Sequence, residues 1–324
     1  MESPTKRWKQ TRPNRRHARG RQFHWRRLVV PLALIVLGSA IVLIFLNQGQ
    51  SKGEKTVSRQ LILQEWKKSD WAALRASCDA GLEKHPLDVF YLGMKGIASF
   101  YDAMALQGGD NRDALIADAI VSIRKSLAVG GSDFGGIPRA QLEYILAKAY
   151  YHAGGSSMDL AATYLLEAEK LGYAAPDLHE YLAMIESSLG NDASALAEFD
   201  KAIAIDSSPM LRIAAASVQI RRGNADKAEI LLKEAISGTQ DIVAVEKARL
   251  LLAQVYFSKS RWDDCEAQLT ALVAENPESA EAYYQLGLLY QAKGDQIHAR
   301  AEWRKAVSID PMHAGARQKL AERS

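Results

Sequence analysis

Apolar and polar residues alternate along most of this chain with the spacing of amphipathic helices, and in the last third the same arrangement occurs twice, 34 residues apart. One unit begins at Glu246 and the next begins at Ala280. Both units carry apolar or small residues at positions 7, 8, 11, 20, 24 and 27 and a proline at position 32: Leu252, Ala253, Tyr256, Cys265, Leu269, Leu272 and Pro277 in the first unit, and Leu286, Gly287, Tyr290, Ala299, Trp303, Ala306 and Pro311 in the second. Each unit therefore predicts two helices that pack against each other across a turn.

The residue types of the second unit support this prediction. Gly287 is small where two helices would approach closely, whereas Trp303 is large enough to fill the space between successive helices. Gly294 supplies the left-handed conformation that commonly ends a helix. Pro311 ends the second helix, because proline disfavours helical geometry in the residue before it.

Weaker copies of the unit extend the pattern toward the N-terminus. They begin near Pro209, at Pro176 and near Ala140, and two more begin near Lys55 and Val89. About seven units therefore cover residues 55–313. A helix pair cannot bury its own apolar face and must stack on its neighbours, so the polar segment 314–324 is expected to form the solvent-facing cap of the array. The expected fold is all-α.

The period and the aromatic, Leu-Gly, Tyr, Ala and Pro positions resemble the tetratricopeptide repeat. The resemblance implies a superhelix of about seven helix–turn–helix repeats whose concave groove binds a protein or peptide partner. In that family positions 2, 5, 9 and 12 of the first helix commonly line the groove. Carried over to this chain, they predict a partner-binding strip that contains Tyr144, Tyr151, Met184, Ile213, Ile220, Leu250, Phe257 and Tyr284. The Lys and Asn set with which some members clamp a terminal carboxylate is missing, so that subtype is rejected.

Residues 28–46 form an uninterrupted apolar run of 19 residues without a charge. A helix of this length spans about 28 Å, close to the thickness of the hydrocarbon core of a bilayer. We expect a transmembrane signal anchor at 28–46, followed by a linker at 47–54. A cleaved signal peptide is the alternative, because Gly38-Ser39-Ala40 offers small residues, but apolar residues 41–46 follow them directly.

The charges that flank this run predict the orientation of the chain. Residues 1–27 carry ten Lys or Arg and one acid, which leaves 31 basic and 37 acidic residues in the rest of the chain. The basic tail 1–27 is expected in the cytoplasm and the repeats on the other side of the membrane. In a bacterium this describes a single-pass inner-membrane protein whose repeats lie in the periplasm. The tail suits anionic lipid headgroups, with a docking arm for nucleic acid or an acidic partner as the alternative. Nucleic-acid binding by the mildly acidic repeats is not expected.

No catalytic constellation emerges from the remaining polar residues. The histidines form no familiar metal spacing, and no phosphate-binding glycine loop follows a strand. Cys78 and Cys265 occupy packing positions, and Trp66 and Trp71 are interpreted as packing or capping residues of the first repeat. The glycine-rich segment 130–136 is interpreted as a flexible connector, with an inserted binding loop as the alternative. Since repeats fill nearly all of the chain beyond residue 54, we expect no enzyme activity, cofactor or metal.

The sequence thus predicts a membrane-anchored scaffold that mediates protein–protein interactions at the cell envelope. Two alternatives share this layout. One is a translocon-associated periplasmic chaperone, and the other is a structural component of an envelope machine such as a flagellar or secretion assembly.

Overall fold

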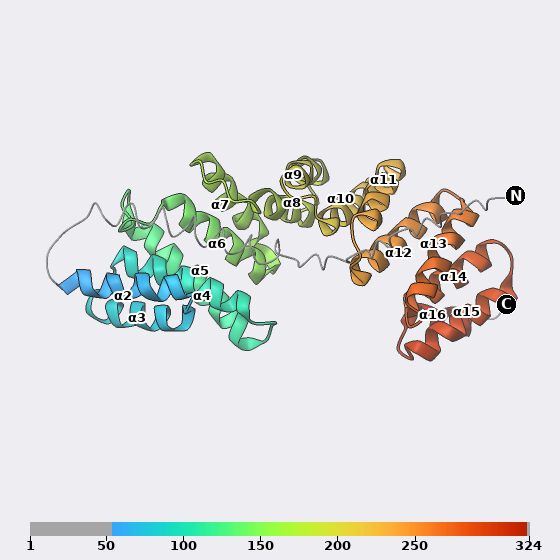
Figure 1. Ribbon diagram of the computed structural model, residues 1–324, viewed down its shortest axis with the longest axis horizontal. Coiled ribbons are helices and arrows are strands. Elements are labelled where there is room, and N and C mark those ends of the chain that lie inside the picture. The colour runs from blue at the N-terminus through green and yellow to red at the C-terminus, as the bar shows by residue number, and fades with distance from the viewer. Residues whose placement is uncertain (1–53, 323–324) are drawn as a thin grey trace, which may run out of the picture. The chain divides into compact units, whose positions relative to one another are not determined.

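The computed structural model describes residues 54–322, which belong to one compact unit and are entirely helical (Figure 1). Fourteen helices, α2 to α15, form seven consecutive helix–turn–helix pairs, and α16 follows the last pair. The pairs are α2 (Glu54–Lys68) with α3 (Trp71–Lys84), α4 (Val89–Ala105) with α5 (Asp110–Gly130), α6 (Arg139–Ala153) with α7 (Met158–Lys170), α8 (Leu178–Ser188) with α9 (Asp192–Ile205), α10 (Pro209–Arg221) with α11 (Ala225–Ser237), α12 (Ile242–Ser258) with α13 (Trp262–Glu275) and α14 (Ala280–Ala292) with α15 (Gln296–Ile309). A short 3₁₀ turn, η1 (Gly155–Ser157), precedes α7, and α16 spans Ala314–Ala321.

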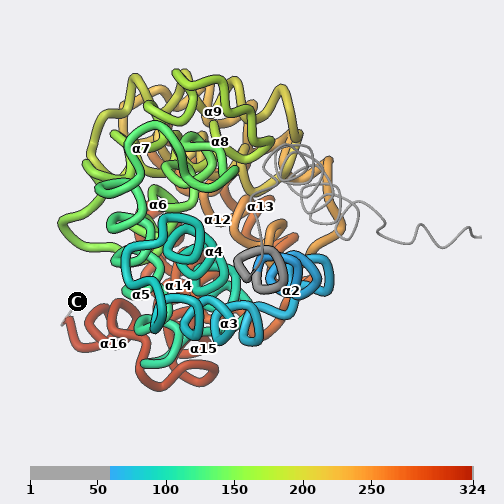
Figure 2. Tube along the Cα trace, turned by 90° about the vertical axis from the view of Figure 1, so that its left-hand side faces the viewer, coloured from blue at the N-terminus to red at the C-terminus, as the bar shows by residue number. Residues whose placement is uncertain are grey.

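Each pair contacts the next in chain order. Figure 2 shows the same helices from the side on which α2 lies in Figure 1. The prediction of an all-α helical repeat is therefore confirmed for residues 54–322. The basic tail 1–27, the apolar run 28–46 and most of the linker 47–54 lie outside the described residues. Within residues 54–322, no helix has both the length and the apolar character that a membrane crossing requires.

The seventh pair, α14 and α15, shows how the predicted turn residues end the helices. Gly294 follows α14 with a φ of 83°, in the left-handed region that glycine adopts most easily. Asp295 then begins α15, where its side chain accepts a hydrogen bond of 3.0 Å from the backbone N–H of His298. Helix α15 ends at Ile309, two residues before Pro311.

Small residues let the two helices of this pair approach closely around one large side chain. Trp303 is 1% exposed, and its indole Nε1 donates a hydrogen bond of 3.2 Å to the backbone oxygen of Tyr284. A Cβ atom on Gly287 would lie only 2.2 Å from that indole nitrogen. Glycine at this position is thus required by the packing of Trp303.

The first two pairs are joined by a cluster of aromatic rings. Trp66 packs edge-on against Trp71 with ring centroids 5.3 Å apart, and Trp71 stacks on Tyr101 of α4 at 5.0 Å. The interpretation of both tryptophans as packing residues is confirmed. Cys78 and Cys265 are also buried with free thiols, as their positions in the repeats predicted.

The glycine-rich segment 130–136 differs from its prediction as a flexible connector. Phe134 is buried, and Ile137 just beyond the segment is buried too. A Cβ atom on Gly130 would lie 2.4 Å from the ring of Phe134, and one on Gly135 would lie 2.6 Å from Cβ of Phe90 in α4. The segment connects α5 to α6 as predicted, but its glycines let it pack onto α4 and α5, where the buried side chain of Phe134 anchors it.

Candidate functional site

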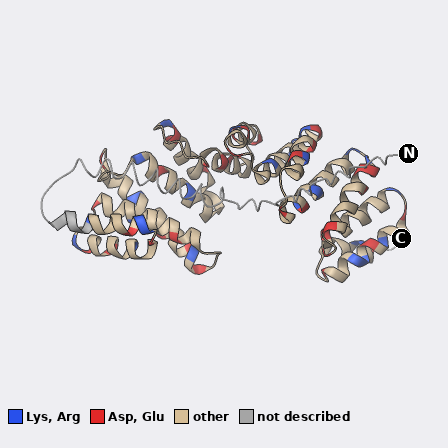
Figure 3. Ribbon diagram, viewed as in Figure 1, with Lys and Arg blue, Asp and Glu red and all other residues tan. Residues whose placement is uncertain are grey.

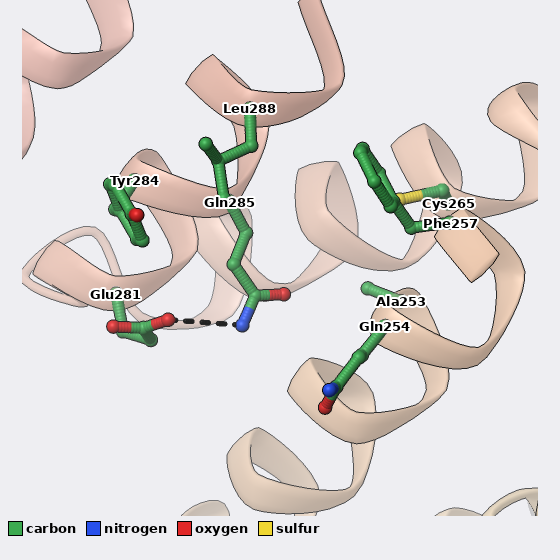
Figure 4. A pocket seen from close by; sticks show the side chains of 8 residues that line it. All are labelled: Ala253, Gln254, Phe257, Cys265, Glu281, Tyr284, Gln285 and Leu288. Carbon is green, nitrogen blue, oxygen red and sulfur yellow. Dashed lines mark hydrogen bonds between the residues drawn. The ribbon is translucent and has the colours of Figure 1, made fainter. Parts of the chain in front are cut away.

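A hollow of about 270 Å³ lies between the sixth and seventh helix pairs (Figure 4). Helix α12 contributes one wall, α14 contributes the other, and Cys265 of α13 lies between them. We call this hollow the α12–α14 pocket; its lining residues are Ala253, Gln254, Phe257, Cys265, Glu281, Tyr284, Gln285 and Leu288.

The lining combines an apolar body with three polar side chains. Phe257, Tyr284 and Leu288 are the large apolar side chains of the lining, and Gln254 is exposed on the opposite wall from Gln285. Burial raises the pKa of the Cys265 thiol to about 11, so this residue stays protonated and behaves as a small apolar group near neutral pH.

Glu281 is the charged member of the lining. Its side chain is 47% exposed. One carboxylate oxygen accepts a hydrogen bond of 3.1 Å from Nε2 of Gln285, as Figure 4 shows. The other lies 3.2 Å from Nε2 of His313, which precedes α16. The carboxylate is therefore held at the pocket while it remains open to solvent.

The neighbouring packing fixes the two large aromatic side chains of the pocket. Phe257 packs edge-on against Trp262 with ring centroids 5.2 Å apart. Tyr284 lies 4.9 Å from the ring of His313, and a Cβ atom on Gly315 would lie 2.7 Å from its ring. The cap helix α16 thus supports Tyr284, so the pocket wall is held in place by the segment that ends the array.

The structure places the eight predicted groove residues in different environments. Phe257 and Tyr284 line the α12–α14 pocket. Ile220 and Leu250 are half-buried against the core of the fifth and sixth pairs, and Met184 packs against a separate core cluster. Tyr151 is half-buried beside Tyr181 of α8.

Two of the eight residues present no open surface. Ile213 is 1% exposed within the core that α10 shares with α11 and α12, and Tyr144 is 4% exposed. The strip predicted from repeat positions is therefore not one continuous accessible surface. Besides Phe257 and Tyr284, the lining residues Gln254, Glu281 and Leu288 also occupy the groove positions of their repeats, whereas Ala253, Cys265 and Gln285 do not. Gln285 could have been found, because it lies four residues after Glu281 and three before Leu288 on one helix face.

Tyr144 is buried because a polar and aromatic network closes the inner face at the third and fourth pairs. Lys148 of α6 forms an ion pair of 2.9 Å with Asp177, and its ammonium nitrogen lies 4.5 Å from the ring centroid of Tyr181. The Tyr144 hydroxyl donates to the same Asp177 carboxylate, and Tyr173 packs over the Tyr144 ring at 4.9 Å. Burial, followed by the Asp177 charge, raises the pKa of Tyr144 far above its usual range.

His152 extends this network at the end of α6. Its Nε2 lies 3.1 Å from the hydroxyl of Tyr181, and its Nδ1 lies 3.3 Å from the guanidinium of Arg112. Burial, together with the positive charges of Arg112 and Lys148, lowers the pKa of His152 to about 4. The imidazole is therefore neutral in the folded protein at neutral pH.

We expect the folded state to lose stability as the pH falls from about 6.5 to about 4 because of His152. The unfolded chain binds a proton at His152 near pH 6.5, whereas the folded chain does so only near pH 4, so protons favour the unfolded state in this window. Allowing for its partial exposure, the loss is about 1–2 kcal/mol. Urea unfolding at pH 7 and pH 4.5 measures it, and His152→Gln should be less sensitive to pH. An equal loss in that variant would contradict the assignment.

One family model and several solved structures resemble parts of this chain. Residues 280–313 match the tetratricopeptide repeat model. The C-terminal part of a TPR repeat-containing protein from Cytophaga hutchinsonii superposes with a TM-score of 0.59 at 13% identity, over 83% of this chain and 100% of that chain. A tetratricopeptide repeat protein from Parabacteroides merdae has a TM-score of 0.49 at 18% identity, over 82% of this chain and 96% of that chain. YrrB, described as a TPR protein with an unusual peptide-binding site, has a TM-score of 0.46 at 19% identity, over 60% of this chain and 96% of that chain. No curated protein matches the sequence.

These observations define the fold. Residues 54–322 form an all-α helical repeat in which each helix pair stacks on the next, the architecture shared with the Cytophaga structure. The seventh helix pair lies within residues 280–313, which match the tetratricopeptide repeat model.

Proposed function

We propose that this protein is a non-catalytic scaffold at the cell envelope that binds a protein or peptide partner in the α12–α14 pocket. The pocket is the observation that supports the proposal. It combines partly exposed apolar and aromatic side chains from two adjacent repeats with polar groups that can fix the orientation of a ligand. An array of stacked helix pairs offers such concave surface to segments of other proteins.

The contrast with the third and fourth pairs strengthens the choice of this pocket. There, the Lys148–Asp177 ion pair and the rings of Tyr144 and Tyr181 fill the inner face with the protein's own side chains. Between the sixth and seventh pairs the corresponding positions surround a hollow. Partner contacts are therefore assigned to repeats six and seven.

A photo-crosslinking amino acid in place of Gln254 should capture the partner in living cells. Gln254 is exposed on the pocket wall, so the probe points toward a bound segment. The matched control carries the same probe in place of Arg304, an exposed residue of α15 that does not line the pocket. Adducts are identified by mass spectrometry.

We expect the probe at Gln254 to give one stoichiometric adduct and the probe at Arg304 to give none. The adduct from the Gln254 probe should disappear when Phe257→Glu or Leu288→Glu is added. Circular dichroism must show that these variants stay folded. Many unrelated adducts would instead support the chaperone, a fixed set of machine subunits would support the envelope assembly, and adducts that persist in both variants would refute binding in the pocket.

We further propose that residues 28–46 anchor the protein in the cell membrane with the repeats outside the cytoplasm. The uncharged apolar run and the ten basic residues before it support this topology. Alkaline phosphatase fused after Ser324 should be active, because it folds only outside the cytoplasm, and the protein should resist carbonate extraction from membranes. If the alkaline phosphatase fusion is inactive and a reporter that works only in the cytoplasm is active when fused after Ser324, the proposed orientation is wrong.

A further inference from the structure

We propose that the α12–α14 pocket selects a basic, apolar segment: an extended peptide that places a Leu-like side chain in the hollow and a Lys or Arg within two residues of it. The inference rests on the proposed function and adds the chemistry of the partner. It follows from the distribution of apolar, amide and charged groups over the pocket.

The floor and walls of the pocket demand an uncharged anchor. Phe257, Tyr284, Leu288 and the protonated Cys265 surround the hollow. A charged side chain buried among these apolar groups would lose its hydration, which is costly. An aliphatic side chain instead removes apolar surface from water on both sides.

The two amide side chains suit the backbone of such a segment. Gln254 and Gln285 project from the walls formed by α12 and α14, respectively, as Figure 4 shows. Each amide offers a donor and an acceptor, the two functions that an extended peptide backbone presents alternately. Neither group carries a charge, so the amides orient a backbone without selecting the charge of its side chains.

Glu281 decides the sign of the neighbouring charge. It is the one charged side chain among the lining residues, and it is about half exposed. Helix α12 carries two cations, and neither lines the pocket: Arg249 pairs with Glu275 of α13 at 2.9 Å, and Lys247 lies two turns before Gln254. A Lys or Arg next to the anchor can therefore pair with Glu281, whereas a partner carboxylate would be repelled.

The wider charge distribution favours the same partner. Acidic and basic residues are interspersed along the described helices (Figure 3). Beyond the first 27 residues the chain carries 37 acidic and 31 basic residues. The small net negative charge adds a weak preference for a basic segment over one that ends in several carboxylates.

Synthetic peptides test this selectivity directly. Fluorescein-labelled nonapeptides with a central Leu carry Lys, Gln or Glu on both sides of it and are titrated with the full-length protein in detergent. We expect the Lys peptide to bind at least about fivefold more tightly than the Glu peptide at low salt, with the difference shrinking at 0.5 M salt. A central Ala should weaken binding about tenfold or more.

A charge reversal in the protein should reverse the preference. Glu281→Lys is expected to favour the Glu peptide, and Glu281→Gln to remove the preference. Glu278→Lys is the matched control, since it changes the net charge equally at an exposed residue outside the lining, and it should keep the wild-type order. Thermal unfolding confirms that the variants are folded.

The possible outcomes separate this inference from the proposed function. Binding that needs the central Leu and is lost in Leu288→Glu, but ignores the flanking charges, overturns the inference and leaves peptide binding intact. A preference that changes equally in Glu281→Lys and Glu278→Lys overturns the role of Glu281. If no peptide binds and the Gln254 crosslinks are insensitive to Leu288→Glu, the proposed function itself fails.

Discussion

Replacing Gly287 with leucine will lower the free energy of unfolding by about 3 kcal/mol, because the new side chain must displace the buried indole of Trp303. Even the first added carbon would lie 2.2 Å from the indole nitrogen, well inside contact distance. Trp303 cannot move into solvent without losing its hydrogen bond to the backbone oxygen of Tyr284 and its burial. Urea unfolding monitored by circular dichroism measures the change.

Two further variants show whether the steric conflict is the cause. Ala292→Leu adds a larger side chain at an exposed position of the same helix and should change stability by no more than about 0.5 kcal/mol. Trp303→Leu removes volume beside Gly287, so Gly287→Leu should cost clearly less in that background than alone. Additive effects of the two substitutions would show that Gly287 matters for another reason.

Replacing Asp177 with asparagine should destabilise the protein by about 2–3 kcal/mol, since it leaves the Lys148 ammonium without its counter-charge. Lys148 is 9% exposed, and its ammonium contacts the faces of Tyr144 and Tyr181 while bonding to Asp177. The cost stays below that of a fully buried pair because the Asp177 side chain is 25% exposed. Chemical unfolding at pH 7 is again the measurement.

The order of the effects is as informative as their size. Lys148→Met leaves a partly solvated carboxylate that still accepts from the Tyr144 hydroxyl, so it should cost less than Asp177→Asn. The double variant removes both charges and should be more stable than Asp177→Asn alone, because apolar replacements of ion pairs are often tolerated. A double variant that is less stable than both single variants would contradict a charge-pair explanation.

The periodic positions of the sequence predicted the repeat architecture because packing between helices constrains them strongly. Leu286, Gly287 and Trp303 each hold a place that only a narrow range of side-chain volumes can fill, and residues 280–313 accordingly match the repeat model. Upstream units deviate from this pattern, yet the same helix pairs form there. Apolar spacing alone was enough to anticipate them.

Which groove positions are open could not be predicted in this way. Tyr144 and Tyr284 occupy the same position in the third and seventh repeats, yet one is buried and the other lines the pocket. Tyr144 is covered by Tyr173 and Asp177 from the adjoining part of the array. Exposure at a groove position depends on the residues of the next repeat, and the periodicity of a single repeat contains no information about them.

Phe134 and Ile137 make the junction between the second and third repeats different from an ordinary turn. Both side chains lie outside the helices, and both are buried against neighbouring helices; Ile137 contacts α4 at Gly93. Repeat proteins commonly evolve by gaining or losing whole units, since each unit contacts only its neighbours. Loss of the second repeat would here leave two large apolar residues without a binding surface. Duplication or deletion should therefore be tolerated more readily elsewhere in the array, and this junction should retain its length among descendants of the chain.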